Sequence, residues 1–436
     1  MANGTSTQSD AAAFRGGLVQ RVTSIRTFQA LENDAFRTLW FGMIASYLAM
    51  QMSMIARGYL AFQISGSATA LGLVTMARGL PQLFLSPFGG VAADRIDKRR
   101  MLIATQVGTS SLAVLTATLI ALDLITIWQL VVIGLVEGCV WAFNMPPRQA
   151  IVAELVDDEH LINAIALNNT GLNFTRIAGP AIAGALISVA WIGVGGVFYL
   201  VALAYSAFIL ALINLPRERN VSVKPTGSVM GQMASGFAYT WRNRPLFLLM
   251  VMAFIPILFG MSYQTLLPVF QERVFKVDAS GLGLLSAFSG IGALIGSLAL
   301  ASLSGIKQKT LLQIGFGVAF GGSLILFALT SSFAIALLFI LLVGLFGNAY
   351  TTLNSTLIMT YSDRTYHGRV MSIYMMTWSL SPLASLPIGA LVDAFGAQQV
   401  MAVFGMIVAG VILLLSPTRL RRRKSGTAPS PDPIST

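Results

Sequence analysis

Long apolar runs limit this chain to one kind of fold. A helix needs about 20 mainly apolar residues to cross the hydrocarbon core of a bilayer. The 436-residue sequence, of which only 10% is charged, contains twelve runs of that kind. They lie at 38–63, 68–91, 101–122, 125–147, 161–189, 194–215, 246–271, 281–303, 310–330, 333–357, 369–392 and 398–416. We therefore predict an all-α membrane protein with twelve transmembrane helices, although polar residues interrupt the runs at 161–189 and 369–392.

The basic residues predict the orientation of these helices. Lys and Arg are retained on the cytoplasmic side of short loops, and most of the 28 lie in the two tails or in every second loop. Both termini are therefore expected in the cytoplasm. The net charge of +11 follows from this topology and from contact with anionic membrane lipid, so we predict no nucleic-acid partner.

A polar segment in the middle divides the chain into two halves of six spans each. The predicted parts are a cytoplasmic amino tail (1–36), an N-terminal bundle (37–215), a cytoplasmic linker (216–245), a C-terminal bundle (246–416) and a basic, then disordered tail (417–436). The linker carries apolar residues at helical spacing, namely Met230, Met233, Phe237 and Trp241. This spacing predicts a short amphipathic helix on the cytoplasmic leaflet.

The two halves also repeat each other in sequence. "ALGLVTMARGL" in span 2 is similar to "GLGLLSAFSGI" in span 8, and "GPAIAGAL" in span 5 is similar to "SLPIGAL" in span 11. A duplicated six-span unit predicts two pseudo-symmetric six-helix bundles. Such a repeat is typical of transporters whose halves rock around a central site.

The hairpin between spans 2 and 3, "GGVAADRIDKRR" at 89–100, concentrates charge at the membrane boundary. One reading is that its basic residues only hold the loop in the cytoplasm. That reading accounts for Lys98, Arg99 and Arg100. It does not account for Asp94 and Arg95, which stand directly at the boundary.

This hairpin resembles the motif of the major facilitator superfamily, Gly-x-x-x-Asp-Arg/Lys-x-Gly-Arg/Lys-Arg/Lys. The matching residues are Gly90, Asp94, Arg95, Lys98 and Arg99, whereas Asp97 stands where the general motif has glycine. An acid there is usual in the branch that includes enterobactin exporters and macrolide efflux proteins. "FRTLWFG", "MPPRQAIVAELV", "LINAIALNNTGLNFTRIAGPAIAG" and "HGRVMSIYMMTWSLSPLASLPIGALVD" are similar to that branch as well. The resemblance implies the major facilitator fold, a monomer in the bacterial cytoplasmic (inner) membrane, and efflux.

The resemblance also implies a role for the hairpin as a conformational latch. In the family the motif aspartate meets the start of span 11, which lies here near His367 and Arg369. A carboxylate is favourable at a helix N-terminus by roughly 0.3–1 kcal/mol. We expect Asp94 to hold the halves together on the cytoplasmic side when the cavity faces outward, with Arg95 paired to Glu154.

Four charges fall inside the spans, where an unpaired charge costs at least ~2.5–3.5 kcal/mol. They are Arg57 in span 1, Arg78 in span 2, Glu137 in span 4 and Arg176 in span 5. In one reading, Glu137 is permanently paired with Arg78 or Arg176. In a second reading, its affinity for protons depends on the direction in which the cavity faces, so it exchanges a proton for substrate. In a third, it binds a cationic substrate.

Three arginines against one acid leave this region positive, which favours an anionic substrate. Arg57 or Arg78 could instead reach the interface or bond to backbone carbonyls. In the C-terminal half, polar or aromatic residues that could complete a cavity or simply pack between helices are Tyr263, Asn348, Asn354 and Trp378. The many Met and Phe residues favour a large amphipathic compound over a sugar.

Span 5 contains "GLNFTRIAGPAIAG", which is similar to the antiporter motif of the superfamily. Gly179, Pro180 and Gly184 match it, and Ala183 replaces one glycine. A proline between small residues predicts a helix bend at a close contact between the halves. Ordinary packing of small residues is the alternative.

Together these features predict a secondary active exporter of hydrophobic or amphipathic small molecules, such as drugs, macrolides or siderophores, driven by the proton gradient. No phosphate-binding Gly-rich loop is present in the sequence, and we expect no cofactor. Cys139, His160 and His367 lack the spacing of metal ligands. The alternatives are an uncoupled translocator of lysophospholipids or siderophores, and a membrane sensor or scaffold without transport. We do not expect an enzyme.

Overall fold

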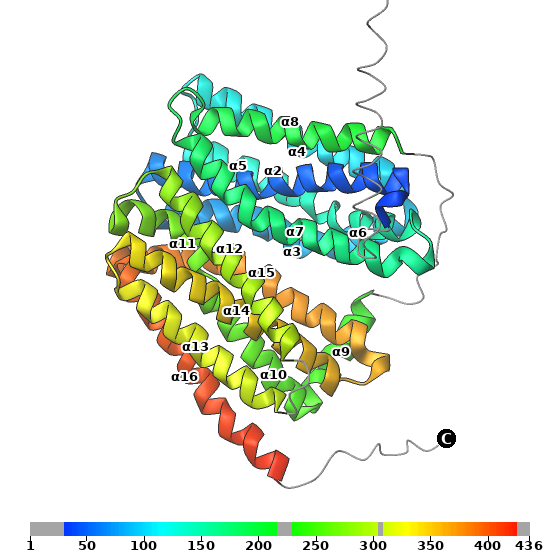
Figure 1. Cartoon of the computed structure of the whole chain (residues 1–436), viewed down its shortest axis with the longest axis vertical. Helices are drawn as coiled ribbons and strands as arrows, with labels where there is room; N and C mark the ends of the chain where they lie inside the picture. The colour runs from blue at the N-terminus through cyan, green and yellow to red at the C-terminus, as the bar shows by residue number, and fades with distance from the viewer. Residues whose placement is uncertain (1–29, 216–228, 304–307, 425–436) are drawn as a thin grey trace, which may run out of the picture.

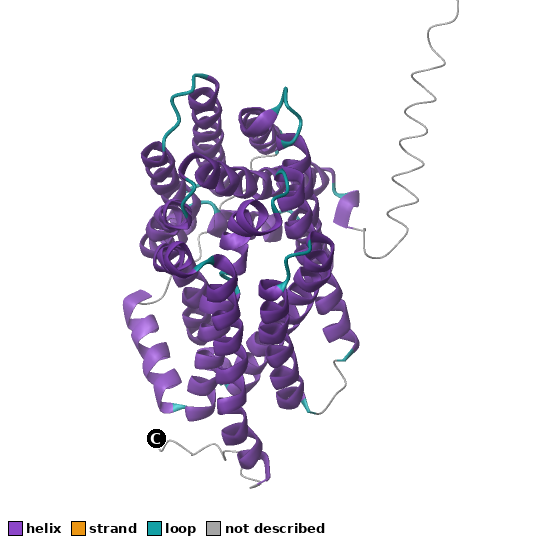
Figure 2. Cartoon of the chain, turned by 90° about the vertical axis from the view of Figure 1, so that its left-hand side faces the viewer, coloured by secondary structure: helices purple, strands orange, loops and turns teal. Residues whose placement is uncertain are grey.

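The described part of the chain is helical. The computed structural model describes residues 30–215, 229–303 and 308–424, and these ranges contain helices and loops but no strand (Figures 1 and 2). The all-α class is therefore confirmed. Both tails, part of the linker and the side chains of Asp94, Glu154, Met230 and Met233 lie outside the described residues.

Ten helical segments are long and apolar enough to span a membrane. In the N-terminal half they are α2 (Asp34–Ser65), α4 (Lys98–Ala121), α5 (Ile127–Ala142) continued by α6 (Met145–Glu154), and α8 (Gly193–Ile213). In the C-terminal half they are α10 (Arg244–Ile255) continued to Phe275, α12 (Ala279–Ser302), α13 (Lys309–Leu329), α14 (Phe333–Tyr361), α15 (His367–Phe395) and α16 (Ala397–Lys424). Two more polar helices, α3 (Ala68–Arg95) and α7 (Asp158–Ile187), complete the twelve predicted spans within the described residues.

Polar residues set the points where several helices begin. The Asn33 side chain accepts the backbone N–H groups of Ala35 and Phe36 at the start of α2, at 3.0 and 3.1 Å. Ser67 and Asp97 cap α3 and α4 in the same way. These caps satisfy N–H groups that have no partner inside the helix. Between α2 and α3 the chain turns at Gly66, whose φ of +61° is easy only for glycine.

The seventh span is irregular because it contains two prolines. After α10 comes a wide π-helical turn, η2 (Pro256–Gly260). The short helix α11 (Tyr263–Val269) is next, and a second π-helical turn, η3 (Phe270–Phe275), follows it. Proline removes a backbone donor and crowds the preceding turn. Pro256 begins η2, and Pro268 lies inside α11, two residues before η3 begins.

The twelve spans form two bundles (Figure 1). In the N-terminal bundle, α2 packs against α7 and α8, while α3 packs against α5 and α4 against α8. In the C-terminal bundle, α12 packs against α14, and α13 against α14 and α16. Two helix pairs join the bundles: α3 with α15, and α7 with α12.

The bundles meet at one end and separate at the other. At the meeting end, backbones are so close that a Cβ added at Gly72 of α3 would lie 2.2 Å from the Ser385 carbonyl oxygen of α15. At the opposite end, where Figure 1 shows α6 and α9 (Val229–Arg242), a Cβ at Gly90 of α3 or Gly368 of α15 would meet nothing within 4 Å. We call this the inner end, because the basic loops predicted to be cytoplasmic lie there. The other is the outer end. In these terms the molecule is open at its inner end, which we describe as open inward.

The linker helix α9 packs on the beginning of α15. The Tyr239 ring stacks on Tyr366 with centroids 4.2 Å apart, and its hydroxyl donates to Asp363 at 3.0 Å. Phe237 and Trp241 on the same helix are exposed. The helix lies where the sequence predicts one, and its contact with the membrane surface stays a prediction.

Candidate transport site

One carboxylate joins three helices inside the N-terminal bundle. Glu137 on α5 is 4% exposed and forms ion pairs with Arg57 of α2 and with Arg78 of α3, the latter at 3.4 Å. Arg57 also donates to the Ser53 hydroxyl at 3.3 Å. Two positive charges and one negative charge leave this Glu137 cluster with a net charge of +1.

The ion pairs of Glu137 agree only in part with the two partners that the sequence predicts, Arg78 and Arg176. Arg78 is one of the two partners that the sequence offered for Glu137, but Arg176 is exposed on α7 and takes no part in the pairing. Arg57 pairs with the carboxylate instead of reaching a backbone carbonyl. Spacing along one helix shows which residues share a face, but not which faces of different helices meet.

A second buried cation was missed at the sequence level. Arg148 falls in the loop after the predicted fourth span, yet α6 continues that span and buries its side chain completely. Its guanidinium donates to the Ser46 hydroxyl at 2.8 Å and lies over the rings of Tyr47 and Phe208, at 4.7 and 4.9 Å from their centroids. The available signal was the spacing of Glu137, Trp141, Asn144 and Arg148, which places all four on one helix face.

Other buried polar groups lie beside Arg148. Gln106 of α4 donates to Ser46 at 3.2 Å, and Asn144 donates to the Thr105 hydroxyl at 2.8 Å. The Trp141 ring lies near both cationic groups, with its centroid 5.6 Å from Arg78 and 5.9 Å from Arg148. A polar region therefore runs inside the N-terminal bundle from the Glu137 cluster toward the inner end.

The predicted cavity residues of the C-terminal half mainly hold helices together. The Tyr263 and Ser289 hydroxyls are 2.7 Å apart and tie α11 to α12. Asn348 donates to the Ala293 carbonyl at 2.9 Å. Asn354 is completely buried and bonds to Gln313 and to the Leu249 carbonyl. Trp378 is 37% exposed and remains available to a ligand.

The outer end is closed by an acid that the sequence analysis did not select. Asp393, near the end of α15, accepts the backbone N–H groups of Ala68 and Thr69 at 3.0 and 2.8 Å, and the hydroxyls of Ser67 and Thr69 at 2.7 and 2.8 Å. Arg273 pairs with the same carboxylate at 3.1 Å. Sequence position alone placed Asp393 at the outer end of span 11, and its role was not apparent because its partners on α3 are more than 300 residues away in the chain.

At the inner end, the two sides of the predicted latch are apart. α15 begins at His367, as expected, and Arg369 donates to Ser235 of α9 at 3.1 Å. On the other side, Arg95 is exposed and Arg99 donates to the Ile213 carbonyl of its own bundle. Lys98 begins α4. The latch is expected to close only when the cavity faces outward, so it stays a prediction in this inward-open molecule.

The span 5 motif lies at a contact between the bundles. Gly179 faces α2, where a Cβ would lie 2.5 Å from the Gln51 side chain. Gly184 faces α12, where a Cβ would lie 2.7 Å from the Gly283 Cα atom, and Pro180 lies inside α7 between them. Small residues let α7 pack closely against α2 of its own bundle and against α12 of the other bundle. The predicted helix bend at Pro180 stays a prediction.

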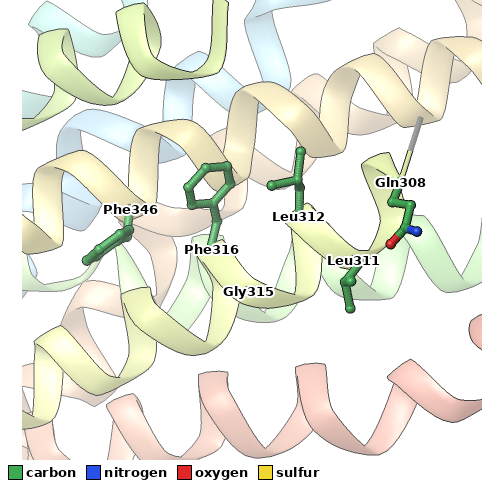
Figure 3. A pocket seen from close by; sticks show the side chains of 6 residues that line it. All are labelled: Gln308, Leu311, Leu312, Gly315, Phe316 and Phe346. Atoms are coloured by element: carbon green, nitrogen blue, oxygen red, sulfur yellow. The ribbon is translucent and has the colours of Figure 1, made fainter. Parts of the chain in front are cut away.

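A surface pocket lies away from all of these residues. It has a volume of about 380 Å³ and is formed by α13 and α14, as Figure 3 shows. Its lining is apolar except for Gln308: the other residues are Leu311, Leu312, Gly315, Phe316 and Phe346. It is therefore separate from the Glu137 cluster.

Comparison with known families agrees with this architecture. Residues 25–431 match the family described as transmembrane secretion effectors. The chain belongs to the transmembrane secretion effector family of the major facilitator superfamily. As a member of that family, it is a multi-pass membrane transporter.

Individual relatives of this transmembrane secretion effector include efflux proteins. It is 29% identical to the staphyloferrin A transporter of Staphylococcus aureus, over 78% of this chain and 85% of the relative. It is 23% identical to macrolide efflux protein A of Streptococcus pyogenes, over 87% and 93% of the two chains. A bacterial homologue of the iron transporter ferroportin, solved in an inward-facing state, matches with a TM-score of 0.70 at 14% identity, over 89% and 98% of the two chains. That structural likeness confirms the fold.

Proposed function

We propose that this transporter exports amphipathic small molecules in exchange for protons, and that Glu137 carries the proton. The observation that supports this proposal is the burial of one carboxylate between Arg57 and Arg78 on three helices. A proton on Glu137 removes the charge that attracts both arginines. Protonation therefore changes how α2, α3 and α5 are held together.

Arg78 is the most exposed member of the Glu137 cluster. The Arg78 side chain is 27% exposed, whereas Glu137 and Arg57 are nearly enclosed. A molecule entering from the open inner end would reach Arg78 before it reached the acid. Substrate and proton can then influence each other through this arginine without direct contact.

Proton exchange restricts the charge of the substrate. A proton on Glu137 leaves Arg57 and Arg78 without their counter-ion and so favours an anion beside them. By linkage, the anion would equally favour the proton. An anionic substrate would thus travel with the proton, whereas an exporter must exchange the two. The proposal therefore fits a neutral or cationic amphiphile, unlike the anionic substrate that the arginine count favours.

The relatives support export of small molecules. One is named as a transporter of staphyloferrin A, and another for efflux of macrolides. The polar, aromatic and methionine-rich character of the spans suits compounds of that size. We propose that both termini lie in the cytoplasm of a bacterial cell, because this orientation puts the open end of the molecule on the side from which an exporter collects substrate.

Transport by purified protein in vesicles tests the proposal. The panel would include dyes, macrolides, siderophores and lysolipids, each measured with and without an imposed pH gradient. We expect at least one neutral or cationic amphiphile to move against its gradient only when a pH gradient is present. Movement of every compound at the same rate without the gradient would contradict proton exchange.

One observation favours a second candidate, an uncoupled translocator. Glu137 already has two positive partners and could remain paired throughout the cycle. The net positive charge of the cluster would then attract an acidic amphiphile such as a lysophospholipid or a siderophore. In the vesicle experiment, this candidate predicts transport of anions that does not respond to the pH gradient.

A further inference from the structure

We propose that Asp393 forms an outer lock, which holds the transporter open inward and must break in each transport cycle. The proposal does not depend on which substrate or ion is transported. It rests on the contacts of one carboxylate and on the helix pair that carries it.

The carboxylate joins the two bundles at the outer end. Asp393 belongs to α15, whereas Ser67, Ala68 and Thr69 form the beginning of α3. Two backbone N–H groups and two hydroxyls of α3 donate to it. A carboxylate at a helix N-terminus accepts N–H groups that have no partner within the helix, and it meets the positive end of the helix dipole. Closing this contact therefore satisfies groups in both bundles at once.

Arg273 extends the lock. It belongs to η3 of the C-terminal half and pairs with Asp393 at 3.1 Å. The same guanidinium donates to the Gly66 carbonyl and lies 5.2 Å from the centroid of the Phe62 ring, both in the N-terminal half. The arginine therefore holds the acid in place and also reaches across to the other bundle.

The contacts are suited to repeated opening. The Asp393 and Arg273 side chains are 26% and 41% exposed, so water can solvate both charges when the contact breaks. The Glu137 cluster is different, because its acid is enclosed. A partly hydrated, charge-assisted contact is strong enough to bias an equilibrium and weak enough to be exchanged for water.

The position of the lock at one end of the α3–α15 pair determines which conformation it favours. α3 and α15 pack side by side and run in opposite directions, with the end of α15 beside the beginning of α3. Asp94 stands one residue before the end of α3, and Asp393 stands two residues before the end of α15. The expected inner latch at Asp94 and the outer lock at Asp393 therefore occupy opposite ends of one helix pair. Because the inner ends are apart when the outer ends touch, closing one contact requires opening the other.

Distances between spin labels test the lock. In a Cys139→Ser background, labels at Trp191 and Ser331 report the outer end, and labels at Asp157 and Thr365 report the inner end. All four residues are exposed; the first three are loop positions, and Thr365 lies in the single helical turn Arg364–Tyr366 before α15. Asp393→Asn keeps the shape of the side chain and removes its charge. We expect the outer-open population to rise at least tenfold, with the outer distance increasing and the inner distance decreasing.

A matched control separates the lock from a general loss of charge. Asp123 is exposed in the outer loop between α4 and α5, and asparagine readily adopts its positive φ of 54°. Asp123→Asn therefore removes a carboxylate at the same end of the protein, but we expect both distance distributions to stay as in the wild type.

A milder variant covers the case in which Asp393→Asn does not fold. Thr69→Val removes one hydroxyl donor while leaving the backbone N–H group in place, and we expect it to shift the distances in the same direction by a smaller factor. Unchanged distances in the folded Asp393→Asn protein, or an equal shift in Asp123→Asn, would overturn the proposal. If only Thr69→Val can be measured, its failure to shift the distances would do so.

Discussion

The guanidinium carbon of Arg148 lies 4.7 Å from the centroid of the Tyr47 ring, in the interior of the N-terminal bundle. No described carboxylate forms an ion pair with Arg148. Its charge is instead met by aromatic faces and one hydroxyl. A buried cation that lacks an acidic partner is costly, so its retention needs an explanation.

The first prediction concerns that cost. Arg148→Met replaces the cation by an apolar side chain that can fill much of the same space, and Ser46 keeps its bond from Gln106. Because replacing a buried charge in this way is often neutral or stabilising, we expect the unfolding temperature in detergent to stay the same or rise. Loss of transport at unchanged stability would then show a functional role for the charge. A fall of more than about 3 kcal/mol in unfolding free energy would contradict this view of the site.

The second prediction concerns the contact between α3 and α15. A Cβ at Gly72 would lie 2.2 Å from the Ser385 carbonyl oxygen, so Gly72→Ala should force the helices apart at the outer end. We expect a loss of roughly 1–3 kcal/mol in thermal unfolding, as is usual for overpacking. Gly90→Ala is the control, because a Cβ there meets nothing within 4 Å. Equal stability of the two variants would show that the outer contact is looser than described.

The third prediction distinguishes packing from substrate binding at Asn354. This residue is completely buried and bonds to Gln313 and to the Leu249 carbonyl. Asn354→Leu leaves buried partners without their bonds, at a cost of about 1–3 kcal/mol. We expect a lower unfolding temperature but normal transport per folded molecule, compared with Asn169→Leu at an exposed position. Lost transport with unchanged stability would instead place Asn354 in the substrate site.

The fourth prediction concerns the inner latch. Asp94→Asn should abolish or greatly slow transport while leaving insertion and folding intact, because the variant lacks the charge that meets the start of α15 in the outward-facing state. Asp97→Asn in the same hairpin is the control. Asp97 caps α4 by accepting the Arg100 N–H group at 2.7 Å, and asparagine caps helices equally well. Normal transport by a well-expressed Asp94→Asn protein would count against the latch.

Most of the architecture was predictable from the sequence. Apolar length is a local property, and it located spans such as α8 and α14 to within a few residues at most ends. The two spans absent from the purely apolar set, α3 and α7, carry Arg78 and Arg176 at membrane depth. The apolar runs at 68–91 and 161–189 nevertheless predicted both spans, and the sequence repeat includes them.

The site was less predictable because its geometry depends on contacts between distant segments. Arg57 and Glu137 are 80 residues apart, and nothing in either helix alone shows that they meet. Arg148 was assigned to a loop because a short break precedes α6 and the apolar run ends there. Asp393 was placed at the outer end of a span with no role, since its role depends on a helix N-terminus in the other bundle.

Proton release on substrate binding tests the central claim most directly. The purified transporter is mixed, in weakly buffered detergent solution with a pH indicator, with the amphiphile that the vesicle experiment identifies. If substrate and proton exclude each other at Glu137, the wild-type protein should release up to about one proton per molecule, and Glu137→Gln should bind the compound without releasing any. Proton uptake by the wild type, or equal release by both proteins, would contradict the account.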